Sequence, residues 1–259
     1  MHNSLFFGIL AFALFSCMGK AEKQKEAENK NSYDLSKPQK VYELSKELKE
    51  ISGIEYMPDN SIACIQDEDG EIFIYNLSTS QIDRSIPFAE KGDYEEIAKV
   101  GEDFFVLRSD GTVFHKQPNQ TKTYDTPLSD KDDTESLCFD KYNDRLIIGS
   151  KKGHKSFYAF SLENFSLAKA PLFSINDKKF NPTAVEIHPQ TQEFYVLSKE
   201  RIFIFSKEGT LKEQLDLDPS LFSQAEGISF KEDGTLFISN EANDAKATIL
   251  EFNYHSYGH

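Results

Sequence analysis

Ser52-Gly53-Ile54-Glu55-Tyr56 is the first of five related segments that decide the fold of this 259-residue chain. The shared form is a polar or acidic residue, a small residue, an aliphatic residue and, two positions further on, an aromatic or aliphatic residue. The other four are Glu95-Glu96-Ile97-Ala98-Lys99, Glu135-Ser136-Leu137-Cys138-Phe139, Thr183-Ala184-Val185-Glu186-Ile187 and Glu226-Gly227-Ile228-Ser229-Phe230. The segment at residues 95–99 is the least regular, because Lys99 stands where an apolar residue is expected. The aliphatic positions of the five segments are 43, 40, 48 and 43 residues apart, and a strand-rich repeat of this length is typical of a β-propeller.

Each segment begins a repeat that contains two further strand patterns. In the first repeat these are residues 62–65 and 72–75, joined by a turn that ends in Asp69-Gly70, and Asp-Gly pairs favour tight hairpins. One further repeat length is made up by two pieces from the ends of the chain: the residues after Ile228 and those between Lys40 and Ile54. We therefore expect an all-β fold, a five-bladed β-propeller, with six blades as the alternative. Residues 40–48 should supply the outer strand of the last blade and close the ring without an exposed strand edge.

The first 38 residues predict an export signal, a lipid anchor and a tether. Leu5 to Phe15 is an uncharged apolar run that is too short to span a bilayer, and it suits a signal peptide over residues 1–16. The run ends in Leu14-Phe15-Ser16-Cys17, which has the form of a bacterial lipobox. We expect Cys17 to be acylated and to hold the protein on membrane lipid. The alternative is an ordinary secretory signal in which Cys17 is incidental. Residues 17–38 are rich in Lys, Glu, Asn and Gln and predict a flexible tether.

The composition of the whole chain narrows the classes of partner for the propeller domain, residues 39–259. A net charge of −14 argues against nucleic acid, because phosphate recognition requires basic patches. The 22 Phe and 11 Tyr favour strands. Cys64 and Cys138 lie in apolar strand patterns, so we expect buried free thiols. We expect a monomer in the cell envelope, lipid-anchored and facing the periplasm or the cell surface.

Polar residues occupy the same two positions in every repeat, which indicates a shared site. The first residues of the five segments are Ser52, Glu95, Glu135, Thr183 and Glu226, and two residues earlier stand Glu50, Asp93, Asp133, Asn181 and Gln224. In a propeller the second strand of a blade ends where its inner strand begins. The second strands here end at Asp67, Arg108, Lys151, Lys199 and Asn240-Glu241. We therefore expect a ligand site at one channel mouth, made of Asp67, Glu95, Arg108, Glu135, Lys151, Lys199, Glu226 and Glu241.

Three glutamates that converge on a narrow mouth repel one another, which raises their pKa values or requires a cation. Pairing with Arg108, Lys151 and Lys199 is one remedy. The five acids of the site exceed these three bases by two charges, which matches a divalent ion. Ca²⁺ is the candidate cofactor because it takes 6–8 oxygen ligands, and we expect Glu95, Glu135 and Glu226 to be its ligands. The alternative is that the mouth residues only satisfy loop backbone groups and ordered water.

The chain resembles the SdiA-regulated family of bacterial proteins over roughly residues 40–254. The resemblance rests on residues 48–54, Asp93-Tyr94-Glu95, Asp133-Thr134-Glu135, residues 181–184 and residues 224–228. It implies a five-bladed propeller behind an N-terminal signal or anchor, with a site at the channel mouth that maps onto Glu95, Glu135 and Glu226. Glu96 departs from the pattern, because a small residue is expected there.

Three functions remain open from the sequence. The leading hypothesis is a membrane-anchored extracytoplasmic propeller that binds a small ligand or a divalent cation at the channel mouth. A second is a metal-dependent hydrolase that acts on a lactone, an ester or a phosphate, for which the sequence identifies no general base. A third is a protein-interaction scaffold of the cell envelope. The ligand and any protein partner are not identified by the sequence.

Overall fold

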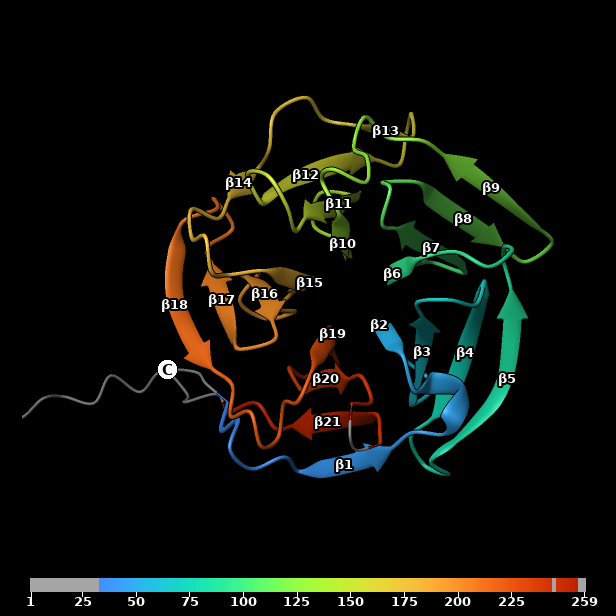
Figure 1. Ribbon diagram of the computed structural model, residues 1–259, viewed down its shortest axis with the longest axis vertical. Helices are drawn as coiled ribbons and strands as arrows, with labels where there is room; N and C mark the ends of the chain where they lie inside the picture. Colours follow the sequence, from blue (N-terminus) through green and yellow to red (C-terminus); the bar gives the residue numbers. More distant parts are fainter. Residues whose placement is uncertain (1–32, 244–245, 256–259) are drawn as a thin grey trace, which may run out of the picture.

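The computed structural model describes residues 33–243 and 246–255, and it is a ring of five antiparallel β-sheets around a central channel. Figure 1 looks down this channel, with one strand of each sheet nearest the centre. The expected five-bladed propeller is confirmed. The one helical element among the described residues is a single 3₁₀ turn, Lys46–Leu48, and no described helix is long and apolar enough to cross a membrane.

The blades follow one another along the chain, and each begins with its inner strand. Blade 1 contains β2 (Ile51–Met57), β3 (Ser61–Gln66), β4 (Glu71–Asn76) and β5 (Gln81–Pro87). Blade 2 contains β6 (Tyr94–Val100), β7 (Asp103–Arg108), β8 (Val113–Gln117) and β9 (Gln120–Tyr124). Blade 3 contains β10 (Thr134–Asp140), β11 (Arg145–Ser150), β12 (Ser156–Ser161), β13 (Ser166–Leu167) and β14 (Phe173–Ser174).

The last two blades complete the ring. Blade 4 contains β15 (Pro182–Ile187), β16 (Phe194–Ser198), β17 (Arg201–Phe205) and β18 (Leu211–Asp216). Blade 5 contains β19 (Ala225–Phe230), β20 (Leu236–Asn240), β21 (Thr248–Phe252) and β1 (Lys40–Glu43).

The blades are joined by five hydrophobic clusters, one at each interface between neighbouring sheets. Strand β7 shows how the sequence builds them. Phe104 and Val106 pack against blade 1, whereas Phe105 and Leu107 pack against blade 3. A middle strand is therefore buried on both faces, and for this reason it is apolar at successive positions instead of alternating.

The N-terminal strand closes the ring as expected. β1 pairs with β21 in antiparallel register, from Lys40 opposite Glu251 to Glu43 opposite Thr248. In Figure 1 the blue N-terminal strand lies beside the red C-terminal one. This pairing brings segments from near both ends of the described chain into the one sheet of blade 5.

Tyr33 and the residues that follow it, within the segment predicted as a tether, are already packed against the propeller. Tyr33 and Leu35 are buried in the cluster between blades 4 and 5. The Tyr33 hydroxyl donates to Gly234 O at 2.6 Å and lies 2.9 Å from His188 Nε2. Because His188 Nδ1 accepts from the backbone N–H groups of Gln190 and Thr191, Nε2 carries the ring proton and donates to Tyr33.

The predicted signal peptide, Cys17 and most of the predicted tether lie outside the described residues. The other two cysteines, Cys64 and Cys138, are fully buried and unbridged, as expected from their strand patterns.

Tyr33→Phe tests the N-terminal attachment. The substitution leaves Gly234 O and the His188 N–H without a partner, so we expect it to lower the free energy of unfolding by about 1–2 kcal/mol. The thermal midpoint should fall by about 2–4 °C for each kcal/mol. Tyr158→Phe is the matched control, because no described residue hydrogen-bonds its hydroxyl. Equal midpoints for the two variants would contradict this role of Tyr33.

Candidate functional site

A β-bulge at the start of every inner strand positions the site. In each blade the register between the inner and second strands shifts at the same place. The bulged positions are Ser52-Gly53, Glu95, Glu135, Thr183 and Glu226-Gly227. Bulges leave a residue unpaired and re-aim its side chain. The five polar residues singled out by the sequence repeat are therefore the residues that leave the ladder. We call this end of the channel the bulge mouth.

The bulged side chains divide into two roles. The Ser52 hydroxyl donates to Tyr94 O in blade 2 at 2.8 Å, and the Thr183 hydroxyl donates to Ala225 O in blade 5 at 3.2 Å. These two residues join neighbouring blades, which is the structural alternative considered from the sequence. The side chains of Glu95, Glu135 and Glu226 hydrogen-bond no backbone group of the described residues, and their carboxyl groups interact with other charged groups at the mouth.

Five carboxyl groups interact electrostatically around the bulge mouth and form what we call the carboxylate ring: Asp67, Glu95, Glu135, Glu226 and Glu241. Glu135 interacts with Glu95 and Glu226, and Glu241 interacts with Glu226 and Asp67. Asp93 lies between Glu95 and Asp67 electrostatically, because its charge raises the pKa of both. The structure thus brings together all five acids that the sequence assigned to this site.

Two of the three predicted bases accompany the ring. Lys151 Nζ lies 2.6 Å from Glu135 Oε1, and Lys199 Nζ lies 3.4 Å from Glu226 Oε1. Arg108 turns away from the glutamates. It forms an ion pair with Asp110 at 2.7 Å, contacts Thr112 and lies over the Phe114 ring. Five acidic side chains therefore face two bases, so acidic groups exceed basic groups by more than the sequence count suggested.

The pKa values in the ring follow from this imbalance. Burial, followed by the charges of Glu135 and Asp93, raises the pKa of Glu95 to about 10. Burial raises the pKa of Glu135 to about 7, although Lys151 opposes the shift. Burial and the neighbouring charge of Glu50 raise the pKa of Asp67 to about 6, and burial with Glu226 raises that of Glu241. At neutral pH Glu95 therefore holds a proton, beside a Glu135 that is near its midpoint.

The ring has oxygen donors but is not a preassembled metal centre. Within residues 33–243 and 246–255, no group of three or more His, Cys, Asp or Glu side chains is spaced to hold a metal ion. An all-carboxylate donor set suits Ca²⁺ chemically. Asp67 Oδ1 is buried and has no hydrogen-bond partner among the described residues, so it can accept from a ligand.

Glu96 stands one residue beyond the bulge of blade 2, where the other blades have a small residue. Its side chain is 1% exposed, and Oε1 accepts from the N–H groups of Ile54 and Ile97, each at 3.1 Å. A Cβ atom on Gly53 would lie 2.4 Å from the same oxygen, so the glycine of blade 1 makes room for the glutamate of blade 2. Burial raises the pKa of Glu96 well above its usual range. Glu96 was noted from the sequence only as a departure, and it joins two blades.

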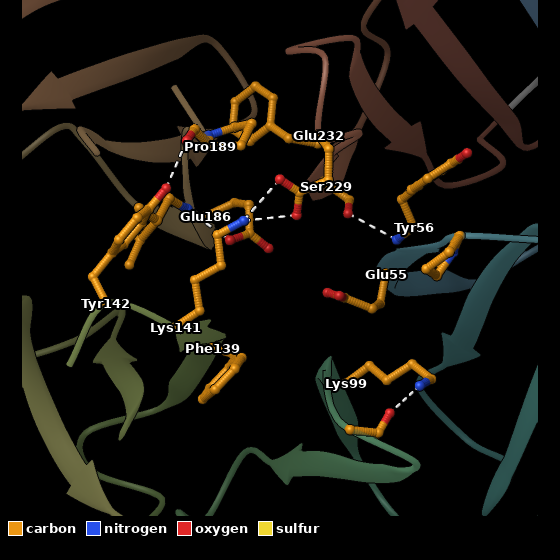
Figure 2. A pocket seen from close by; sticks show the side chains of 14 residues that line it. Glu55, Tyr56, Lys99, Phe139, Lys141, Tyr142, Glu186, Pro189, Ser229 and Glu232 are labelled. Atoms are coloured by element: carbon orange, nitrogen blue, oxygen red, sulfur yellow. Dashed lines mark hydrogen bonds and ion pairs between the residues drawn. The ribbon is translucent and has the colours of Figure 1, made fainter. Parts of the chain in front are cut away.

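The opposite end of the channel, the far mouth, carries a pocket that sequence reasoning missed. The pocket has a volume of about 250 Å³ and is lined by residues from all five blades, and Figure 2 shows Glu55 and Glu186 pointing into it. A signal was present in the repeat. Glutamate follows the aliphatic position in blades 1 and 4, where the other blades have Ala98, Cys138 and Ser229.

Comparisons with known proteins agree with this fold. The sequence matches the SdiA-regulated family over residues 28–244, and no curated protein matches it. The structure is similar to glutaminyl cyclase from Myxococcus xanthus, with a TM-score of 0.66, 13% identity, and coverage of 86% of this chain and 97% of that one. It is also similar to a gluconolactonase from Xanthomonas campestris (TM-score 0.58, 11% identity, 78% and 72% coverage). A third similar structure is virginiamycin B lyase from Staphylococcus aureus (TM-score 0.51, 12% identity, 85% and 74% coverage). At these identities the likeness establishes the fold alone.

Glu95→Gln tests the charge imbalance of the ring. Between the pKa of the unfolded carboxyl, near 4.5, and the raised pKa of the folded one, only the unfolded chain releases its proton, so the free energy of unfolding falls as pH rises. Glutamine cannot ionise and should remove this fall. Between pH 5 and pH 9 we expect the free energy of unfolding of the variant to rise relative to that of the wild type by at least about 1 kcal/mol, since one pKa unit corresponds to about 1.4 kcal/mol.

Urea unfolding at several pH values measures this difference. Glu163→Gln is the matched control, because Glu163 is exposed in a turn of blade 3, outside the carboxylate ring. Parallel pH profiles for the wild type and Glu95→Gln would show that Glu95 is an ordinary surface carboxylate.

Proposed function

The chain belongs to the SdiA-regulated family, and from that premise we propose that it is a membrane-anchored extracytoplasmic protein that binds a small cationic ligand at the bulge mouth. The observation that carries the proposal is the carboxylate ring, in which five converging acids are paired, within the described part of the chain, with Lys151 and Lys199 alone. Neighbouring acids help to raise the pKa values of Asp67, Glu95, Glu135 and Glu241, so a positive charge placed among them relieves the repulsion and favours their ionised forms.

Two features of the mouth favour a bound ligand over acids that are neutralised only by the lysines of the protein. Asp67 Oδ1 is buried without a partner among the described residues. Lys199 is exposed and lies 3.4 Å from Glu226, which is a loose pair that a ligand can displace. An organic ammonium group satisfies Asp67 and the glutamates with N–H donors. Ca²⁺ is the other occupant we consider, and it has to compete with Lys151 for Glu135 and with Lys199 for Glu226.

The location is proposed from the sequence at the N-terminus. The lipobox form of residues 14–17 supports acylation of Cys17, with the propeller held on the periplasmic side of a membrane or at the cell surface. A ligand-binding propeller on a lipid anchor is well suited to capture small molecules in the cell envelope.

An acid–base enzyme at the same mouth is a second candidate. Glu95 and Glu135 are neighbours whose pKa values of about 10 and about 7 differ, and such pairs divide the roles of general acid and general base. The similar structures include a cyclase, a lactonase and a lyase by name. Hydrolysis of a lactone, an ester or a phosphate is the reaction class proposed for this chain, with Glu95, Glu135 and Glu226 as ligands if a metal takes part.

Thermal unfolding of the full-length protein in detergent, with added cations, tests the binding function. We expect a saturable rise of the midpoint with a diamine such as putrescine, or with CaCl₂ if the cation is a metal. At 100 times the Kd a ligand adds about 2.7 kcal/mol, which corresponds to a rise of about 5–10 °C for a domain of this size. Glu135→Gln and Glu226→Gln should abolish the rise.

Glu163→Gln is again the control and should respond like the wild type. NaCl at matched ionic strength separates binding from screening of surface charge. A midpoint that no cation moves, or that rises equally in Glu226→Gln and in the wild type, would contradict a cation site in the carboxylate ring.

A further inference from the structure

The far-mouth pocket has the form of a second binding site, separate from the carboxylate ring. It is a concavity of about 250 Å³ at the end of the channel where the inner strands finish. All five blades contribute to its wall, so its shape is fixed by the closed ring and not by one mobile loop. A formed concavity with a few convergent polar groups is the usual geometry of a small-molecule site.

Two carboxyl groups converge in this pocket, and no Lys, Arg or His of the described residues lies within ion-pair distance of either of them. Glu55 comes from β2 and Glu186 from β15, and in Figure 2 they point toward each other across the pocket. Glu186 Oε1 accepts from the neighbouring N–H of Ile187, and no described residue hydrogen-bonds the Glu55 carboxyl. Burial and the charge of Glu186 raise the pKa of Glu55 well above its usual range, and burial raises that of Glu186 to about 8.

The two lysines of the pocket are bound elsewhere. Lys141 Nζ contacts both carboxylate oxygens of Glu232, at 2.6 and 2.9 Å, and Lys99 Nζ donates to Gly101 O. Both lysines weaken the repulsion in the pocket at longer range. Neither hydrogen-bonds Glu55 or Glu186, so the centre of the pocket has carboxyl oxygens with free accepting capacity.

Aromatic side chains form part of the wall. Tyr56, Phe139, Tyr142 and Phe230 line the pocket, and the first three are labelled in Figure 2. Tyr142 is held in place because its hydroxyl donates to Pro189 O at 2.6 Å. Aromatic faces attract organic cations and also offer apolar contact to the body of a ligand. Carboxyl groups surrounded by aromatic rings are a poor match for a hydrated metal ion and a good match for an amine.

A buried and incompletely satisfied polar group lies behind the pocket. Glu96 is 1% exposed, and its Oε2 has no partner among the described residues. It interacts electrostatically with both Glu186 and Glu55, so a third carboxyl group acts on the pocket from within the blades. A cation at the far mouth therefore acts on three carboxyl groups at once.

We propose that the far-mouth pocket binds a small organic amine, with the ammonium group between Glu55 and Glu186 and the apolar part against the aromatic wall. This site is independent of the carboxylate ring, because it uses the opposite ends of the inner strands and none of the ring residues. The fit follows from charge and shape together. An alcohol of the same shape keeps the apolar contact but lacks the charge, and a metal ion lacks the apolar body.

Ligand-observed ¹⁹F NMR with the full-length protein tests this site. The probe is 4-fluorobenzylamine, and 4-fluorobenzyl alcohol is its neutral counterpart. We expect the amine to bind with a Kd of about 1 mM or tighter, so binding is clear at about 10 mM. The alcohol should bind at least ten times more weakly. Glu55→Gln, Glu186→Gln and the double variant should weaken the amine at least tenfold and leave the alcohol unchanged.

Glu163→Gln, at an exposed turn outside both mouths, is the matched control and should bind the amine like the wild type. Glu226→Gln is measured beside it, because a loss of amine binding in Glu226→Gln reports on the carboxylate ring, whereas a loss in the double variant reports on the far mouth, so each proposal can fail without the other. The far-mouth proposal is overturned if amine and alcohol bind equally, if the amine does not bind the wild type, or if the double variant binds the amine like Glu163→Gln. Single variants are measured alongside the double one, and their thermal midpoints report on folding.

Discussion

The β-bulge at the start of each inner strand is the feature on which the site depends. A regular strand alternates its side chains between its two faces, and both faces of a propeller blade are buried against neighbouring blades. The bulges interrupt this alternation at the same phase in all five repeats. They allow Glu95, Glu135 and Glu226 to leave the apolar interfaces and meet at the bulge mouth. Ser52 and Thr183 use the same irregularity to bind the backbone of the next blade.

Both ends of the channel place carboxyl groups where burial and mutual repulsion disfavour their ionised forms. The five interblade clusters compensate for this, because they bury nearly every apolar side chain of the middle strands. The two mouths differ in what surrounds the acids. Lysines accompany the acids at both mouths, and the far mouth adds an aromatic wall. The ligand proposed for the far mouth differs accordingly, because aromatic rings offer apolar contact to the body of an organic amine.

The repeat spacing was enough to predict five blades and closure by residues 40–48, because a propeller repeats its burial pattern once per blade. The position of each acid within the repeat predicted which acids lie at the bulge mouth. It did not predict the direction of Arg108, because Asp110 in the following turn captures the guanidinium at 2.7 Å. The position of a residue along its strand determines at which mouth of the channel it lies. The direction of a long side chain depends on the polar groups next to it. Glu55 and Glu186 were missed for a related reason: each reads as one polar residue in an apolar strand, and only the closed ring brings them together.

Direct titration of the ring glutamates tests the central claim that the bulges gather more negative charge than the bulge mouth neutralises. Carboxyl ¹³C NMR of protein labelled at glutamate, assigned with Glu95→Gln and Glu135→Gln, follows each group separately. We predict that Glu95 is still protonated at pH 7, with a pKa of about 10, and that Glu135 titrates at about 7. If both groups titrate at the ordinary glutamate pKa near 4.3, the mouth is already neutralised and the account is wrong.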